Sequence, residues 1–425
     1  MRRAGRLLPV VLASALFVPV LGALGALPRA SADEAAYRHL VDRATRVLKE
    51  AEGLHAAGRR DLGRERARRA AALLAQADRQ KPTDANVAFL SVQAGVFAED
   101  AEAARLWITR YLRRTPYGEK DPNLHYARAL VWLRLDGRPG QAVRSLDRMA
   151  ELSPRGLTRP AHVLLYEALT TLARSLVDAG HVGDAVQRFR RASDVARRMG
   201  DASKEMAARA NGAITLLESG RAADAEKLLA RLHLQQPANA VFAFYLGRSL
   251  RLQDRPAEAA PLLRKAAAAV DAGRVAPQHA DLVREAWLEL GLALRQLATQ
   301  LDDAERKAEA YGGARRAFER YTTLTPRHGL GWHHLGRLLA LDLDLPLDAV
   351  PALERAYALD PVCDGALRLL IRIAGQSLPP PGETPDGWRE RREAWVAELK
   401  KNVEAWEAER EKRRADSRIG TDGCP

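Results

Sequence analysis

The stretch WHHLGRLLALDLDLPLDAVPALERAYALDP, residues 332–361, decides the fold class. Apolar residues recur every three or four positions in each half of it, which is the spacing of one face of a helix. These positions are Trp332, Leu335, Leu339, Leu353 and Ala356. The small residues Gly336 and Ala349 would let two helices touch, and Pro361 would end the second helix. The stretch therefore predicts an antiparallel helical hairpin.

The same spacing of small residues and prolines recurs upstream. The residues that mark it most clearly are Gly247, Ala259, Trp287, Gly291, Ala314 and Pro326. We count about eight such units between Asp33 and Pro361. One copy, from Trp287 to Pro326, contains about eleven extra residues between its two halves, which predicts a lengthened hairpin. One hairpin cannot bury its own apolar face, so the repeats must stack.

This pattern resembles the tetratricopeptide repeat, in which Trp, Leu-Gly, a small Ala and a closing Pro recur over about 34 residues. The resemblance implies an all-α fold: a right-handed superhelical solenoid of about eight hairpins over residues 33–361. A scarcity of aromatic residues, at 5%, and of β-branched clusters agrees with helices throughout. The alternative is another helical repeat, of the Sel1 or HEAT type, whose units are longer.

The residues after the repeats have a different composition. We expect a capping helix at 362–378, a Pro-rich break at 379–385, a charged amphipathic helix at 386–415 and a disordered tail at 416–425. The charged helix carries a narrow apolar stripe, namely Trp388, Trp395, Leu399, Val403 and Trp406. This stripe could pack on the end of the solenoid or dock a partner.

Residues 1–32 have the features of a signal peptide. A basic start is followed by an apolar run from Leu7 to Leu27 and by small residues at Ala30 and Ala32. We expect cleavage between Ala32 and Asp33, and hence a periplasmic or secreted protein. An uncleaved N-terminal membrane anchor is the alternative, because the apolar run is long enough to span a bilayer.

Charge and cysteine content limit the function further. Residues 1–32 carry four arginines and no acidic residue, so their removal lowers the formal net charge from +13 to +9. The remaining excess is modest and fits either solubility or an acidic partner. Export weakens a nucleic-acid role. Cys363 and Cys424 could form a disulfide in an oxidising compartment, or Cys363 could stay a buried thiol.

No catalytic motif, cofactor site or metal site is predicted. The chain lacks the Gly-x-Ser-x-Gly, His-Glu-x-x-His, phosphate-loop and Cys-x-x-Cys patterns. His328, His333 and His334 form the one chemical-looking cluster. Adjacent histidines on a helix point about 100° apart, so they cannot readily share a metal ion, and we expect surface histidines beside Trp332.

The resemblance also implies a binding groove, because the first helix of each tetratricopeptide hairpin lines the concave face. By motif position, this groove would hold Arg134, Arg174, Phe244, Arg248, Arg251, Arg295, His333 and Arg337. The arginines would favour carboxylates of an acidic protein or peptide. We therefore expect a non-catalytic binding scaffold or adaptor in the cell envelope. The alternatives are an accessory or regulatory subunit of an envelope enzyme or assembly machine, and a self-associating spacer.

Overall fold

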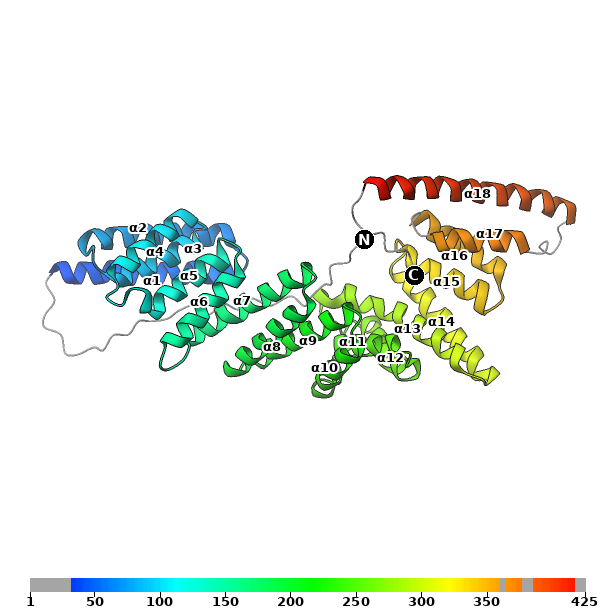
Figure 1. Ribbon diagram of the computed structural model, residues 1–425, viewed down its shortest axis with the longest axis horizontal. Coiled ribbons are helices and arrows are strands. Elements are labelled where there is room, and N and C mark those ends of the chain that lie inside the picture. Colours follow the sequence, from blue (N-terminus) through cyan, green and yellow to red (C-terminus); the bar gives the residue numbers. More distant parts are fainter. Residues whose placement is uncertain (1–31, 360–363, 377–384, 417–425) are drawn as a thin grey trace. The chain divides into compact units, whose positions relative to one another are not determined.

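The computed structural model describes residues 32–359, 364–376 and 385–416, and these residues form helices with no strand among them. They fall into two compact units, which meet in sequence between Ser219 and Gly220. Below, the N-terminal unit means residues 32–219, and the C-terminal unit means the described residues from Gly220 onward. Each is built from antiparallel hairpins stacked in order (Figure 1).

The N-terminal unit contains four hairpins and one further helix. The hairpins are α1 (Ala32–Ala56) with α2 (Arg60–Gln80), α3 (Ala85–Phe97) with α4 (Ala101–Arg114), α5 (Pro122–Arg134) with α6 (Pro139–Leu152), and α7 (Arg159–Asp178) with α8 (Val182–Arg198). A short 3₁₀ turn, η1 (Gly118–Lys120), precedes α5, and α9 (Ala202–Glu218) packs on α8.

The C-terminal unit begins with α10 (Ala222–Gln235), which packs on the first of three hairpins. These are α11 (Ala240–Leu252) with α12 (Pro256–Asp271), α13 (Ala280–Gln300) with α14 (Ala304–Leu324), and α15 (Gly329–Arg337) with α16 (Pro346–Leu359). The 3₁₀ turn η2 (Pro277–His279) leads into α13, and the π-helical turn η3 (Leu338–Asp342) continues α15.

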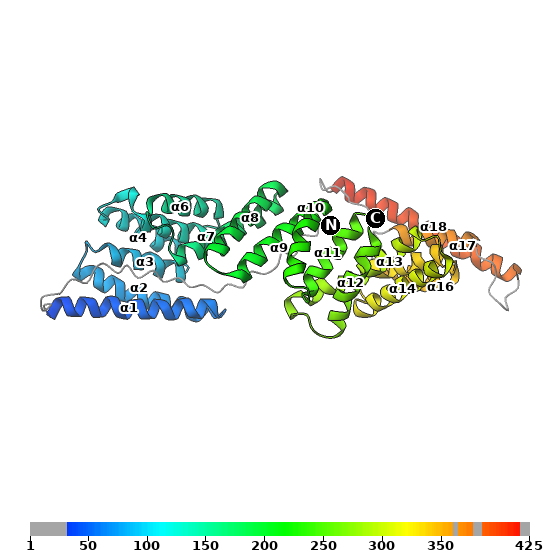
Figure 2. The ribbon, with the colours of Figure 1, turned by 90° about the horizontal axis from the view of Figure 1, so that it is seen from below.

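Two layers of helices result within each unit. The first helices of successive hairpins contact one another, as in α1–α3–α5–α7 and α11–α13, and we call them the inner helices. We call the second helices of the hairpins the outer helices, and Figure 2 shows the hairpins from another side. Inner helices are buried on nearly all sides: ten of the 13 residues of α11 are buried. A helix with apolar residues all round is expected where neighbours cover every face.

The small residues lie where the helices of a hairpin touch. A Cβ atom added at Gly291 would come within 2.5 Å of the Phe318 ring, and one added at Gly336 within 2.6 Å of the Leu353 side chain. Gly247 lies equally close to Leu263, at 2.7 Å. The alanines on the second helices that the sequence marks, namely Ala259, Ala314 and Ala349, are fully buried. Glycine is therefore required at these contacts because any side chain would overlap the opposite helix.

Local signals set the helix ends. Asp84, Asp100, Asp121, Asp201 and Asp303 each accept a hydrogen bond from a backbone N–H of the first turn that follows them. Such caps satisfy amides that have no partner inside the helix. The Trp332 Nε1–H donates to the carbonyl oxygen of Pro326 at 3.1 Å, which ties the start of α15 to the turn before it.

The lengthened hairpin is present. α13 and α14 each have 21 residues and are joined by only three residues, 301–303. The extra residues of this copy thus add helical turns to both arms, because Ala, Glu, Arg and Lys favour helix over loop. The all-α solenoid fold is confirmed.

Two helices follow the last hairpin: α17 (Asp364–Gln376) packs on α16, and α18 (Pro385–Asp416) packs on α17. Leu399, at 6% exposure, is the buried contact of α18. Both helices agree in position with the expected capping and charged helices. Several predicted features lie outside the described residues: the signal segment up to residue 31, Pro361, both cysteines, residues 379–384 of the Pro-rich break and residues 417–425 of the tail. Within the described ranges, no helix combines the length and apolarity needed to cross a bilayer.

Candidate functional site

Most of the predicted groove arginines form ion pairs within the chain. Arg134 of α5 pairs with Glu167 of α7. Arg248 and Arg251 of α11 both pair with Glu289 of α13, the first at 3.2 Å. Arg295 of α13 donates from Nη2 to Asp342 of η3 at 3.2 Å. In each case the acid belongs to the next hairpin, so these arginines tie neighbouring repeats together.

The pairing leaves an excess of positive charge in the C-terminal unit. One carboxylate, Glu289, serves two guanidinium groups. Arg337 of α15 is half-buried and has no ion pair within the described part of the chain. Arg174 lies half-buried on α7 in the N-terminal unit, and it takes part in an interaction of its own.

Phe244 and His333 do not line an open groove. The Phe244 side chain is fully buried on α11 and packs edge-on against Tyr245 with ring centroids 5.0 Å apart. His333 is 4% exposed and lies against α17, where a Cβ atom added at Gly365 would meet its Cε1 atom at 2.8 Å. The expectation that these side chains face a partner is corrected. The physical reason is that neighbouring helices cover the inner helices on almost every side.

The adjacent histidines are core residues rather than surface residues. His334 is 8% exposed and stacks on Phe318, with ring centroids 5.8 Å apart. Burial, together with smaller effects of the nearby His333, Arg295, Arg337 and Arg251, lowers the pKa of His334 to about 3. A neutral imidazole therefore sits among positive groups. His328 is close to the Tyr321 hydroxyl, at 2.6 Å.

The inner layer of the N-terminal unit contains a hollow of about 290 Å³. It lies at the C-terminal ends of α1, α3 and α5. Its lining is Glu52, His55 and Ala56 of α1, Arg60 of α2, Val96 and Phe97 of α3, Glu99 of the turn after α3, and Leu130, Leu133 and Arg134 of α5. Apolar side chains and the charged side chains of Glu52, Arg60, Glu99 and Arg134 both line the hollow, so it can contact apolar and polar groups of a ligand.

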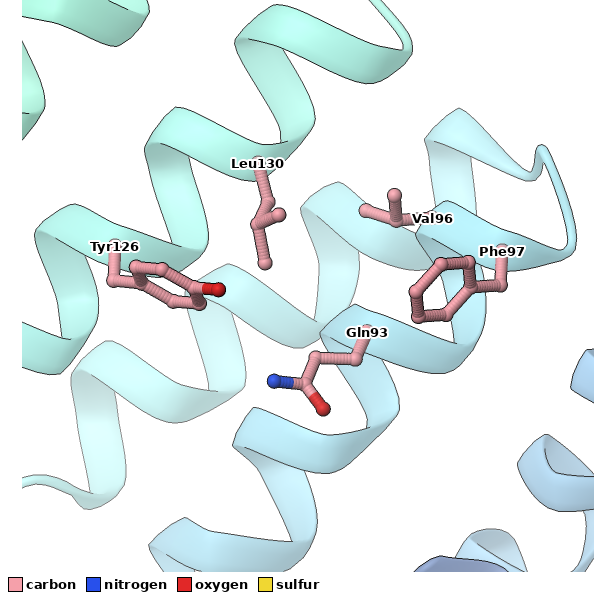
Figure 3. A pocket seen from close by; sticks show the side chains of 5 residues that line it. All are labelled: Gln93, Val96, Phe97, Tyr126 and Leu130. Atoms are coloured by element: carbon pink, nitrogen blue, oxygen red, sulfur yellow. The ribbon is translucent and has the colours of Figure 1, made fainter. Parts of the chain in front are cut away.

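A small inner pocket of about 10 Å³ adjoins this hollow, and Val96, Phe97 and Leu130 line both. Gln93 and Tyr126 complete it (Figure 3). Figure 3 shows the Tyr126 hydroxyl and the Gln93 amide directed into the space between α3 and α5. Burial, with smaller effects of Glu52 and Glu167, raises the pKa of Tyr126, so its hydroxyl stays protonated.

The wall of the hollow is held by His55. Its Nε2 atom lies 2.9 Å from the carbonyl oxygen of Phe97, and the two rings are 5.6 Å apart. Gly63 of α2 leaves room for this ring, because a Cβ atom there would come within 2.5 Å of the imidazole. The charged side chains that line the hollow are mostly paired: Glu99 accepts from Arg64 at 2.9 Å, and Arg134 pairs with Glu167. Arg60 has no ion pair within the described residues.

The hollow and the inner pocket are lined by apolar, neutral polar and charged side chains. Among the residues with described positions, no group of three His, Cys, Asp or Glu side chains could hold a metal ion. Neither the hollow nor the inner pocket contains a nucleophile next to a base. Instead, the two offer apolar surface, two neutral hydrogen-bonding groups and charged side chains. A peptide segment can use all three.

The sequence did not indicate this site. Motif positions placed Arg134 of α5 in the groove but did not select Tyr126 on the same helix, and Gln93 belongs to the weakly matched second hairpin. One signal was available: both are polar residues within otherwise apolar runs, FLSVQAGVF and HYARALVW. A buried polar side chain in such a run needs a partner.

The fold is tetratricopeptide-like, with helical hairpins closed by glycine contacts and stacked in two layers. No protein-family profile matches the chain, and neither does any curated protein. Solved structures match at low identity. The C-terminal part of a TPR repeat-containing protein from Cytophaga hutchinsonii is 12% identical, with a TM-score of 0.46 over 66% of this chain and 99% of that one.

Two further structures are similar over about half of their own length. The Cut9–Hcn1 hetero-tetramer of the APC/C matches at 15% identity and a TM-score of 0.38, over 73% of this chain and 53% of that one. A signal transduction ATPase of the STAND class with a tetratricopeptide repeat sensor, from Pyrococcus horikoshii, matches at 11% identity and a TM-score of 0.43, over 83% and 54%.

Proposed function

We propose that this protein is a non-catalytic scaffold that binds a peptide segment of a partner protein in the hollow of its N-terminal unit. The observation that carries the proposal is the hollow itself, a space of about 290 Å³ between inner helices that are elsewhere closely packed, lined by apolar side chains such as Val96, Phe97 and Leu133 together with charged ones. Stacked helical hairpins generally serve as interaction surfaces, because they offer an extended face without an enclosed reaction chamber.

The C-terminal unit would contribute a second, electrostatic contact. Arg251, Arg295 and Arg337 all lie near enough to His334 to lower its pKa, so three guanidinium groups gather on one part of the inner layer. Glu289 and Asp342 neutralise part of this charge, and a positive excess remains. An acidic stretch of the partner would be attracted there.

We place this function in the cell envelope, because residues 1–32 have the composition of a signal peptide. Fractionation of cells that produce the protein, followed by N-terminal sequencing, tests this. Recovery from the periplasm or medium with Asp33 as the first residue agrees with the proposal. Recovery from the cytoplasm with an intact N-terminus contradicts it.

Site-specific photocrosslinking tests the binding surface. A photoreactive residue replaces Leu133, which lines the hollow, and in a matched variant it replaces Leu106, which is 52% exposed on outer helix α4. We expect crosslinked partner only from position 133, and competition by a peptide of the partner's crosslinked segment. Equal crosslinking from both positions, or crosslinking only from position 106, would overturn the use of the hollow.

A further inference from the structure

Two buried polar side chains of the N-terminal unit face the inner pocket without satisfying one another. Gln93 is 7% exposed and Tyr126 is 1% exposed. Neither makes a hydrogen bond to any other residue in the part of the chain that the structure describes. Buried polar groups almost always have a partner, because an unmade hydrogen bond in an apolar site costs free energy. Their polar atoms nevertheless keep contact with the open space of the inner pocket, so a polar group that enters this space, a water molecule included, can pair with them.

The size of the pocket limits what that group can be. Its volume of about 10 Å³ holds one group the size of a water molecule. Access is from the hollow, because Val96, Phe97 and Leu130 line both spaces. A side chain that branches from a peptide in the hollow must be short to place its polar atom between Gln93 and Tyr126. Serine and threonine have this length, and the threonine methyl group would add contact with the apolar wall.

The charge of the surroundings selects a neutral group. Val96, Phe97 and Leu130 supply no compensating charge, and Arg134 of the hollow already pairs with Glu167. A carboxylate or an ammonium group would lose its hydration without gaining an ion pair in the pocket. A hydroxyl group both donates and accepts, as do the Tyr126 hydroxyl and the Gln93 amide, so it can pair with both.

We propose that the inner pocket is a specificity site for a serine or threonine hydroxyl of the bound peptide, hydrogen-bonded between Tyr126 and Gln93. This inference rests on the proposed peptide-binding function of the hollow. It specifies the type of partner residue that the inner pocket recognises. The specificity is for the unmodified hydroxyl, because a phosphate group exceeds the volume of the pocket.

The test begins with a phage-displayed library of random peptides selected on the full chain. Peptides that bind the full chain but not a Leu133→Arg variant depend on the hollow. We expect these hollow-dependent peptides to share Ser or Thr at one position. Binding of one such peptide and of its Ser→Ala or Thr→Val counterpart is then measured by fluorescence polarisation. The hydroxyl peptide should bind about tenfold more tightly, the size of one or two neutral hydrogen bonds.

Tyr126→Phe should abolish this tenfold preference, because it removes the hydroxyl and keeps the ring. Tyr166→Phe is the matched control: Tyr166 is also buried in the N-terminal unit, but its hydroxyl donates to the carbonyl oxygen of Lys204 at 3.1 Å. This control should keep the preference. Thermal melts of both variants show that each remains folded.

Three results would overturn the inference. Hollow-dependent peptides without a shared Ser or Thr would leave the scaffold function standing and show that the pocket reads nothing. Selection of Asp or Glu at that position would show an anionic site instead. An equal effect of Tyr126→Phe on both peptides would mean that the pocket holds only a water molecule. Failure to select any hollow-dependent peptide would contradict the scaffold function as well.

Discussion

The inner layers of the two units are built from the same hairpin but filled differently. In the N-terminal unit, α1, α3 and α5 leave a hollow lined by apolar side chains and by charged ones that are mostly paired. In the C-terminal unit, the corresponding helices carry a cluster of arginines around the buried His334. In both units a small residue lets the two helices of a hairpin approach closely, as Gly95 does against Ala104 and Gly291 against Phe318, whereas the inner layer holds open space in one unit and charge in the other.

The largest expected effect concerns what the two units share. Gly291→Ala would force a Cβ atom into the Phe318 ring, which is itself fully buried, and should lower the free energy of unfolding by about 3 kcal/mol. Gly312→Ala on the adjacent helix α14 is the control, because the nearest atom there is the Arg316 guanidinium at 3.6 Å. It should be neutral or stabilising by up to about 1 kcal/mol. Urea unfolding followed by circular dichroism measures both, and similar losses would refute the contact.

The next effect separates the units. Glu289→Gln leaves Arg248 and Arg251 without their shared carboxylate and should cost about 2 kcal/mol. Glu167→Gln in the N-terminal unit leaves a single arginine, Arg134, and removes a carboxylate whose pKa is raised by burial. It should cost less, about 1 kcal/mol or below. Hydrogen exchange, read separately for peptides of each unit, measures the two losses. An equal or larger loss for Glu167→Gln would break the comparison.

The units should also respond oppositely to acid at two identified groups. The pKa of His334 falls from 6.5 to about 3 on folding, so its contribution is present above pH 6.5 and is lost as the pH falls toward 3. The pKa of Glu167 is raised above 4.5 by burial, so folding gains stability there as the pH falls through that raised pKa. For each group, the free energy of unfolding should change by at most about 1.4 kcal/mol per pH unit.

Hydrogen exchange between pH 7 and pH 4 checks this, with each unit compared against its own non-titrating variant. His334→Gln should flatten the loss in the C-terminal unit, and Glu167→Gln should remove a gain in the N-terminal unit. If neither variant changes the pH dependence of stability in its unit, that pH dependence does not come from the buried His334 and Glu167.

The smallest effect concerns the arginines as a binding surface. Arg337→Ala should weaken binding of an acidic peptide by less than tenfold, and the difference should shrink as salt rises, because exposed charges are screened. Arg79→Ala, at an exposed position of α2 in the N-terminal unit, is the control and should have no effect. Fluorescence polarisation at two salt concentrations measures both. Equal weakening by the control would point to net charge rather than to the arginine cluster.

Much of the fold could be predicted from the sequence because glycine and proline leave local marks. Gly247 and Gly336 precede the leucines that they contact on the second helix, Leu263 and Leu353, by 16 and 17 residues, whereas Gly291 precedes Phe318 by 27 residues because that hairpin is lengthened. Lengthening of α13 and α14 followed from the spacing between Trp287 and Pro326. These features depend on contacts between the two helices of one hairpin, and the spacing of residues within a repeat predicts such contacts.

The inner layer was harder to predict because it depends on contacts between hairpins. Arg134 meets Glu167 33 residues later, Arg251 meets Glu289 38 residues later, and Arg295 meets Asp342 47 residues later. The sequence separation between an arginine and its acidic partner varies with the length of the hairpin between them. Motif positions therefore predicted where the arginines lie but not which acidic residues they pair with. Phe244 was misplaced for a related reason, since a motif position does not reveal how far the next hairpin covers it.

The long hairpin α13–α14 offers a practical handle. Its connection, 301–303, is only three residues long, and Asp302 and Asp303 are exposed. An insertion in such an exposed loop disturbs neither a buried side chain nor a contact between helices. A fluorescent tag placed between Asp302 and Asp303 would show the location of the protein in living cells, and an affinity tag there would allow its isolation. Both termini would stay unmodified.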